Sequence, residues 1–352
     1  GVGSKNSTYL ALALQTTCHA VNHLRGPGEA RDGMFKAIER IARQIAASGA
    51  FIGPRLKLVV APEYFLSGYP LGETIPEWAE RVALAPEGPE YTRLARMCQE
   101  LGIYFSGNAY ETDSHFPGLY FQTSFIIDDA GEVILRYRRL ISMFTPSPHD
   151  VWDAYLAHYG AAALFPVADT PLGKLACIAS EEILYPEIAR ALALNGAEVL
   201  LHSTSEVGSL RPTPKDIAKS ARAFENFAYV VSANSAGVVS GDFPVASADG
   251  RSKVVDYQGE VRAEAAFGES MVAHAAIDIA ALRRQRQTPG MGNTLARLRT
   301  EAFALAYARA VHPANGLLDE QGALRIPDRG QFLSTQMAVI RELTARGTFT
   351  GE

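Results

Sequence analysis

Hydrophobic and polar positions follow two different periods along most of the chain, and together they predict alternating strands and helices. Apolar side chains at Ile38, Ile41 and Ile45 recur every three or four positions, which is typical of an amphipathic helix over 28–49. A β-branched run at 56–61 ends at a proline and predicts a strand. Further strands are predicted at 9–15, 103–107, 120–128, 133–137, 174–179, 198–202, 228–233, 253–257 and 271–277, and further helices at 89–101, 186–195 and 214–227. This alternation favours an α/β fold in which helices cover the outer faces of sheets.

The pattern continues without a break to residue 287 and changes there. No linker rich in Pro, Gly or Ser and no internal repeat interrupts 7–287, so this range is predicted to form one domain. The turn-rich segment 288–293 leads into an Ala- and Arg-rich helical pattern over 294–311. We expect residues 288–352 to form a C-terminal extension that packs on the domain or on a neighbouring subunit.

Composition and charge narrow the classes of partner. A formal net charge of -5 with mixed signs along the chain argues against nucleic-acid binding, which needs clustered and unopposed Lys and Arg. No apolar run approaches the ~20 residues that cross a bilayer. The three cysteines show neither a disulfide framework nor metal-ligand spacing. We therefore expect a cytoplasmic protein that acts on a small molecule without a membrane, metal or other cofactor.

One candidate chemical group lies directly after the strand predicted at 56–61. The segment 61–70 places Glu63 just beyond this buried strand. Partial burial moves the pKa of a carboxylate toward neutrality, so a carboxylate in this position suits a general base. A solvated loop glutamate is the alternative interpretation of the same segment.

Two further segments place polar groups at predicted strand ends. The segment 136–140 ends a strand with Arg139, which could equally be an exposed arginine. The segment 173–187 runs from a glycine through an apolar strand to Ser180 and then to a Pro-Glu pair that opens a helix. Cys177 lies three residues before Ser180, an odd offset that points its side chain to the opposite face of the strand. Its apolar neighbours suit a small buried thiol rather than a nucleophile.

The ordered combination of four segments resembles the nitrilase, or carbon-nitrogen hydrolase, superfamily. These segments are 61–70, 136–140, 173–187 and 221–237. The resemblance implies a four-layer α-β-β-α sandwich that assembles as a homodimer or higher homo-oligomer. It also implies an enzyme that hydrolyses non-peptide carbon-nitrogen bonds in a small amide, carbamoyl or nitrile substrate. By the same resemblance, Glu63 is the general base, Arg139 occupies the position of the catalytic lysine, and Ser180 occupies the position of the nucleophilic cysteine.

The two replacements leave three hypotheses open. Arg139 can stabilise an oxyanion but cannot give up a proton near neutral pH. The hydroxyl of Ser180 attacks only when a base removes its proton, and Glu63 is the base that the resemblance supplies. The chain is then an enzyme with shifted chemistry, an inactive protein of the nitrilase fold that binds a small molecule or a partner, or a cysteine-dependent amidase with an engineered Cys-to-Ser change at 180.

Two other segments are expected to contribute to the pocket because they correspond to segments that face the substrate in relatives. The loop 144–153 carries His149, Asp150 and Asp153, each of which could donate or accept a proton, although a solvated loop accounts for any one of them. The segment 202–206 follows the strand after Ser180, and its histidine is expected to be structural rather than catalytic.

Overall fold

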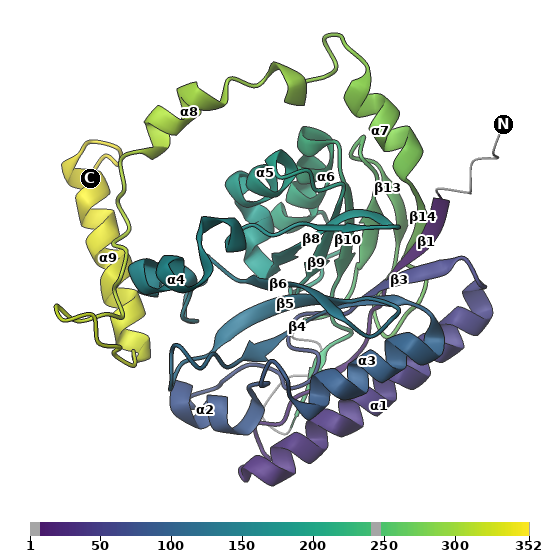
Figure 1. The fold of residues 1–352 in the computed structure, drawn as a ribbon, viewed down its shortest axis with the longest axis horizontal. Coiled ribbons are helices and arrows are strands. Elements are labelled where there is room, and N and C mark those ends of the chain that lie inside the picture. The colour runs from purple at the N-terminus through teal and green to yellow at the C-terminus, as the bar shows by residue number, and fades with distance from the viewer. Residues whose placement is uncertain (1–7, 241–247, 352) are drawn as a thin grey trace.

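The structure is a computed structural model that describes residues 8–240 and 248–351, so the predicted domain start at residue 7 lies outside it. Two six-stranded sheets stack face to face, and helices cover the outer side of each (Figure 1). The prediction of a four-layer α-β-β-α sandwich is therefore confirmed. No helix in the described part of the chain is long and apolar enough to span a bilayer.

The first sheet has the strand order β14-β1-β3-β4-β5-β6. Strands β1, β3 and β4 are parallel, whereas β14, β5 and β6 each pair antiparallel with a neighbour. Their bounds are β1 Thr8–Ala13, β3 Leu56–Val60, β4 Tyr104–Glu111, β5 Phe121–Ile127, β6 Val133–Arg138 and β14 His274–Asp278. Because β6 is antiparallel to β5, which is antiparallel to β4, the carboxyl ends of β3 and β6 lie at the same edge.

The second sheet has the strand order β13-β12-β10-β9-β8-β7, with β8, β9 and β10 parallel. Its strands are β7 Ala168–Thr170, β8 Gly173–Ala179, β9 Val199–Ser203, β10 Tyr229–Ala233, β12 Lys253–Val255 and β13 Val261–Glu264. A separate pair joins β2 Cys18–His19 to β11 Val238–Val239. The carboxyl ends of β8 and β9 are therefore neighbours, as parallel pairing requires.

Helices complete the outer layers. The first sheet is covered by α1 Pro27–Ile52, α2 Ile75–Val82 and α3 Pro89–Leu101, and the second by α5 Pro186–Leu194 and α6 Pro214–Asn226 (Figure 1). Side chains between the sheets are fully buried, among them Leu58, Leu175 and Val231. Burying each such side chain contributes about 1.5–3 kcal/mol, which makes the two sheets a rigid base for the loops at their ends.

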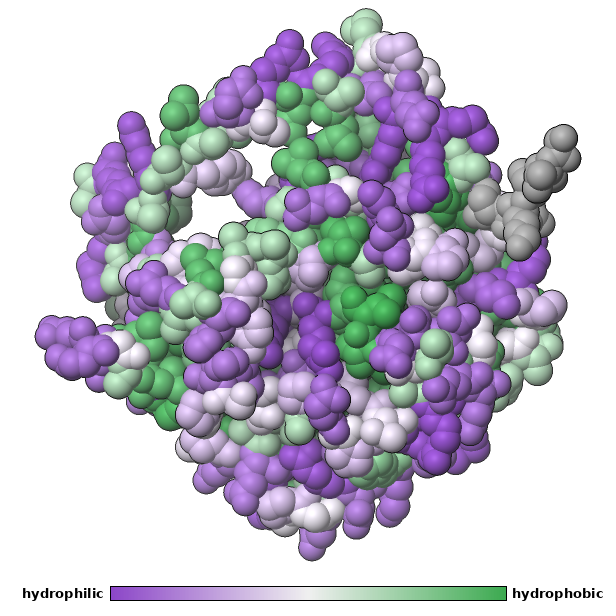
Figure 2. Space-filling model, in the orientation of Figure 1, coloured by the Kyte–Doolittle hydropathy of each residue, from purple (hydrophilic) through white to green (hydrophobic). Residues whose placement is uncertain are grey.

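The chain after the second sheet follows a long path around the molecule. After α7 Ile279–Gln287 it forms a short 3-10 turn, Leu295–Arg297, and then α8 Thr300–Tyr307, which arches toward α9 Arg329–Ala345 (Figure 1). Figure 2 shows open space between this arch and the body of the molecule. The helix predicted over 294–311 is wrong in extent, because no side chain of α8 is buried and short helices depend on packing for stability.

The part of the extension beyond α8 contacts the loop that follows β6. The backbone N–H groups of Asn315 and Leu317 donate to the carbonyl oxygens of His149 and Asp150, both at 3.0 Å. The Leu317 side chain is 2% exposed and belongs to the same core cluster as α1 and α3. The helix α4 Trp152–Tyr159 lies beside α9 in the same region (Figure 1).

The packing of Leu317 predicts that Leu317→Ala lowers the free energy of unfolding by about 2–4 kcal/mol, because the truncation leaves a cavity in a buried cluster. Leu305→Ala is the matched control, since Leu305 is 77% exposed on α8 and should change that free energy by less than about 0.5 kcal/mol. Urea unfolding followed by fluorescence measures both. Equal effects of the two variants would contradict this packing of the extension.

Candidate active site

Glu63 is buried at the carboxyl end of β3 and is 1% exposed. Its Oε1 accepts hydrogen bonds from Gln122 Nε2 at 2.8 Å and from Arg139 Nη1 at 3.3 Å. Its backbone N–H donates to the carbonyl oxygen of Thr204 at 3.3 Å. Oε2 is buried and has no hydrogen-bond partner among the described residues. Gln122 and Arg139 thus hold one oxygen of the carboxylate, and the other oxygen has no hydrogen bond to the described residues.

Arg139 directly follows β6, and its guanidinium spans the site. Nη1 donates to Gln122 Oε1 at 2.7 Å as well as to Glu63, and Nη2 donates to Glu181 Oε1 at 2.8 Å. Nε donates to the carbonyl oxygen of Ile141 at 2.9 Å. The alternative of an exposed arginine is wrong, because Arg139 is 5% exposed.

The charge of Arg139 is fixed by its surroundings. Burial disfavours the guanidinium cation, but the charges of Glu63, Glu182 and Glu181 outweigh burial and raise its pKa. Arg139 therefore stays protonated near neutral pH. Its planar fork reaches a carboxylate on each side, which a single ammonium could not match in geometry.

Ser180 is the first residue of the 3-10 turn Ser180–Leu184, which follows β8 directly. Its φ is 52°, a left-handed conformation that costs a non-glycine residue roughly 1–2 kcal/mol. Its carbonyl oxygen lies 2.8 Å from His202 Nε2. The residue is 7% exposed. Its neighbour Glu181 is the partner of Arg139, so the turn is tied to the Arg139–Glu63 pair at the residue after Ser180.

Glu182 ties the turn to the loop of Arg139, a role that the sequence did not assign to it. The side chain is fully buried and accepts from Tyr137 Oη at 2.6 and 2.7 Å. It also accepts from the backbone N–H groups of Leu140 and Ile141 at 3.0 and 3.1 Å. These bonds fix the residues on both sides of Arg139. The acidic residue two positions after Ser180 was the only signal for it in the sequence.

The same turn is fastened to α6 from the other side. Arg222 pairs with Glu225 at 2.9 Å, as their helical spacing predicts. Its Nε also donates to the carbonyl oxygen of Ile183 at 3.0 Å. Arg222 therefore supports the turn of Ser180 from α6.

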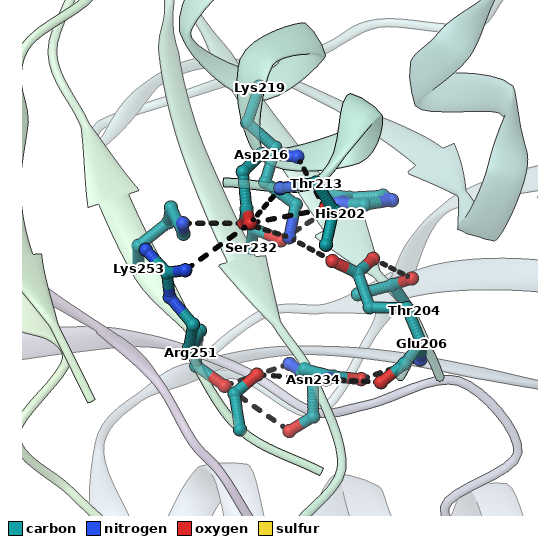
Figure 3. Close-up of polar contacts among 12 residues, drawn as sticks. His202, Thr204, Glu206, Thr213, Asp216, Lys219, Ser232, Asn234, Arg251 and Lys253 are labelled. Atoms are coloured by element: carbon teal, nitrogen blue, oxygen red, sulfur yellow. Dashed lines mark hydrogen bonds and ion pairs between the residues drawn. The ribbon is translucent and has the colours of Figure 1, made fainter. Parts of the chain in front are cut away.

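A buried cluster of charges anchors the segment 202–206 (Figure 3). Lys219 Nζ lies 2.7 Å from Glu206 Oε1, and Lys253 Nζ lies 2.7 Å from Asp216 Oδ1. Burial opposes the ionisation of Glu206, but Lys219 outweighs it and lowers the pKa of Glu206 to about 2. Thr204 Oγ1 donates to the same carboxylate at 2.7 Å. The segment that contacts both Glu63 and Ser180 is therefore firmly held.

The remaining predicted groups lie in different environments. Cys177 is fully buried, and burial raises the pKa of its thiol to about 12, which agrees with a packing role. Asp150 accepts from the N–H and hydroxyl of Ser147 at 2.7 and 3.0 Å and closes its own loop. The described residues contain no group of His, Cys, Asp or Glu that could hold a metal ion.

A cavity of about 510 Å³ lies between the loop after Arg139 and the C-terminal extension. Glu181, His149 and Asp150 line it on the domain side, and Phe332 and Val339 of α9 line the opposite side. Asp153 is not among its lining residues. Because Glu181 also pairs with Arg139, this cavity lies next to the buried site.

Comparison with known proteins identifies curated relatives of the chain. The chain is 28% identical over 235 residues to a formamidase of Pseudomonas syringae pv. syringae, covering 66% of this chain and 63% of that protein. It is 32% identical over 213 residues to a formamidase of Bacillus cereus (strain AH820), covering 59% of each. The chain thus spans less than two thirds of the length of these curated relatives.

Solved structures share the fold at low sequence identity. The carbon-nitrogen hydrolase of Helicobacter pylori G27 has a TM-score of 0.64 at 20% identity, covering 86% of this chain and 99% of that one. A cysteine-to-serine mutant of the amidase from Nesterenkonia AN1 has a TM-score of 0.57 at 21% identity, covering 87% and 100%. Residues 25–287 match the sequence profile described as carbon-nitrogen hydrolase. The chain therefore belongs to the carbon-nitrogen hydrolase family.

Proposed function

We propose that this protein hydrolyses the carbon-nitrogen bond of a small amide, with Ser180 as nucleophile, Glu63 as base and Arg139 as oxyanion stabiliser. The observation that carries the proposal is the buried contact of Arg139 with Glu63 at 3.3 Å, together with its partly buried contact with Glu181, the residue after Ser180, at 2.8 Å. The formamidases that the chain resembles support an amide substrate.

The first half-reaction forms an ester on Ser180. Its Oγ attacks the amide carbon while Glu63 takes the hydroxyl proton on Oε2, the oxygen without another partner. The guanidinium of Arg139 stabilises the negative charge on the former carbonyl oxygen. The intermediate then collapses, the carbon-nitrogen bond breaks, and Glu63 returns the proton to the departing nitrogen, which leaves as ammonia or an amine.

The second half-reaction uses water as the nucleophile. Glu63 removes a proton from water as it attacks the ester carbon, and Arg139 again stabilises the oxyanion. The ester bond breaks, Ser180 regains a proton from Glu63, and a carboxylic acid is released. All proton transfers pass through Glu63, because Arg139 cannot deprotonate.

Removing either reacting group tests the assignment. Ser180→Ala and Glu63→Gln should each lower kcat by at least about 10³-fold on small amides, since nucleophile and base act as a unit. Ser106→Ala is the matched control: Ser106 is also a buried serine, and its Oγ contacts only Cys177 Sγ at 3.6 Å. Ammonia release by each purified protein is the measurement.

The outcomes separate the three hypotheses. Loss of activity in both variants but not in the control supports Ser180 as a working nucleophile. Activity of Ser180→Cys alone would identify the serine as a disabling replacement of a cysteine. If neither the parent nor any variant releases ammonia from amides, N-carbamoyl compounds or nitriles, the hypothesis of an inactive protein that binds a small molecule or a partner is favoured.

The charges of the cavity predict a preference among amides. The lining formed by described residues includes the carboxylates of Glu181 and Asp150 and no Lys or Arg. A neutral aliphatic amide should therefore show a kcat/KM at least about tenfold higher than an amide of equal length that ends in a carboxylate, since like charges repel in a partly desolvated site. The difference in kcat/KM between the two amides should become smaller in 0.5 M salt, because salt screens the repulsion between the charges. Equal rates at low salt would count against this cavity as the substrate path.

We also propose that the chain forms a homodimer through α5 and α6. The two helices are neighbours on the outer side of the second sheet (Figure 1). They expose large apolar side chains, including Ile217 at 63%, Phe224 at 52% and Leu194 at 53%. Exposed large apolar side chains that gather on neighbouring elements are typical of a protein interface. Burying it against a second copy would remove it from water.

The dimer proposal predicts that Ile217→Lys shifts the protein from dimer to monomer in sedimentation velocity, because a buried unpaired cation opposes association. Leu305→Lys, on exposed α8, is the control and should leave the mass unchanged. A monomeric parent, or a dimer that both variants retain, would refute this interface.

A further inference from the structure

His202 lies at the carboxyl end of β9 and is completely buried between two polar groups. Nε2 lies 2.8 Å from the carbonyl oxygen of Ser180, and Nδ1 lies 2.8 Å from Ser232 Oγ. A carbonyl oxygen only accepts, so Nε2 must carry the proton. The contact joins β9 to the residue that stands in the left-handed conformation after β8.

The surroundings decide the protonation state of the ring. Burial, followed by the charge of Lys219, lowers the pKa of His202 to about 3, against a smaller opposing effect of Glu206. The imidazole is therefore neutral near neutral pH, and Nδ1 is left as an acceptor. Ser232 must donate to it. The buried cation of Lys219 in Figure 3 thus helps to fix a single tautomer, with the donor aimed at Ser180.

The hydrogen bond constrains the peptide between Ser180 and Glu181. In a trans peptide the C=O and N–H groups point in opposite directions. With the carbonyl held toward His202, the N–H of Glu181 points away from β9. Turning this peptide over would leave the Nε2 donor of His202 buried without its acceptor, a substantial penalty for any other orientation.

The residues that follow His202 are also held by hydrogen bonds, which keeps the Nε2–H donor of His202 in place. Ser203 Oγ donates to the carbonyl oxygen of Ala61 at 2.7 Å, and the carbonyl of Thr204 accepts from the N–H of Glu63. The strand end that holds the turn of Ser180 therefore also holds the loop of Glu63. A change in this segment is transmitted to both.

We propose that His202 is a positioning residue: its Nε2–H bond to the Ser180 carbonyl holds the nucleophile turn in the left-handed conformation that directs Ser180 toward the Arg139–Glu63 pair. The effect of His202 on catalysis rests on the proposed hydrolase function. Its effect on the conformation of the Ser180 turn does not depend on enzyme activity, so the two effects are tested by separate measurements.

The deciding measurement uses the reactivity of a thiol at position 180. The three native cysteines are buried, and burial raises the pKa of each thiol to about 12, so iodoacetamide should label Ser180→Cys selectively. Adding His202→Leu, which removes the donor, should slow alkylation at least about tenfold, because the thiolate loses its position near Arg139. Adding His202→Gln, whose amide can both donate and accept, should restore the rate to within about threefold.

The second measurement is the kinetics of amide hydrolysis with Ser180 intact. His202→Leu should lower kcat at least about tenfold and leave KM within about threefold, since it changes the reacting geometry rather than substrate binding. His202→Gln should again recover most of kcat. Ile45→Ala, on the buried face of α1, is the control for lost stability and should leave both kcat and KM unchanged at a temperature where the variant remains folded.

The possible results are distinct. Slow alkylation in His202→Leu with rescue by His202→Gln supports the proposal, even if the parent proves to have no hydrolase activity. An alkylation rate that His202→Leu leaves unchanged, or that falls no further than in Ser180→Cys combined with Ile45→Ala, overturns it. Unchanged alkylation together with an active parent would reject the positioning role and leave the proposed function standing.

Discussion

The site depends on one constraint: a permanent cation, Arg139, is buried and must be neutralised by groups around it. Burying an unpaired guanidinium would cost several kcal/mol, so its acceptors are obligatory parts of the structure. Glu63 and Gln122 supply acceptors on one side, and Glu181 supplies one on the other. The cation thus links the loop after β3, the first sheet and the turn after β8.

This link explains why the neighbouring backbone is so tightly fastened. Glu182 holds the residues on either side of Arg139, and Arg222 holds the turn from α6. Both contacts are made by buried polar groups, and breaking their hydrogen bonds would destabilise the fold because the groups would be left unpaired. The strained backbone of Ser180 persists because these contacts and His202 over-determine it.

Sequence periodicity predicted the alternating strands and helices, because buried strands and amphipathic helices carry their burial in their pattern, whereas the four-layer arrangement followed from the resemblance. The prediction of one helix over 294–311 was wrong in extent, because this Ala- and Arg-rich segment has no packing that would stabilise a longer helix. Glu63, Arg139 and Ser180 could be named because the segments around them resemble the family. Gln122 could not be found in this way, and His202 was expected only as a structural residue near the pocket. Its contact with Ser180, 22 positions away, and that of Gln122 with Glu63, 59 positions away, exist only because the folded sheets bring these residues together.

Under the proposed assignment, which places Ser180 and Arg139 at the positions of the family's cysteine and lysine, the two replacements fit one another physically. A cysteine can already be ionised to the thiolate before substrate binds. A serine hydroxyl loses its proton only during attack, so it needs a base that can accept the proton at that step. Arg139 engages Oε1 of Glu63 and leaves Oε2 unpartnered among the described residues. The fork of the guanidinium can hold the base and still direct a second N–H group toward the turn of Ser180. A lysine ammonium is a single compact charge and could not contact Glu63 and the turn of Ser180 with the same planar geometry. A serine at position 180 therefore favours an arginine at position 139.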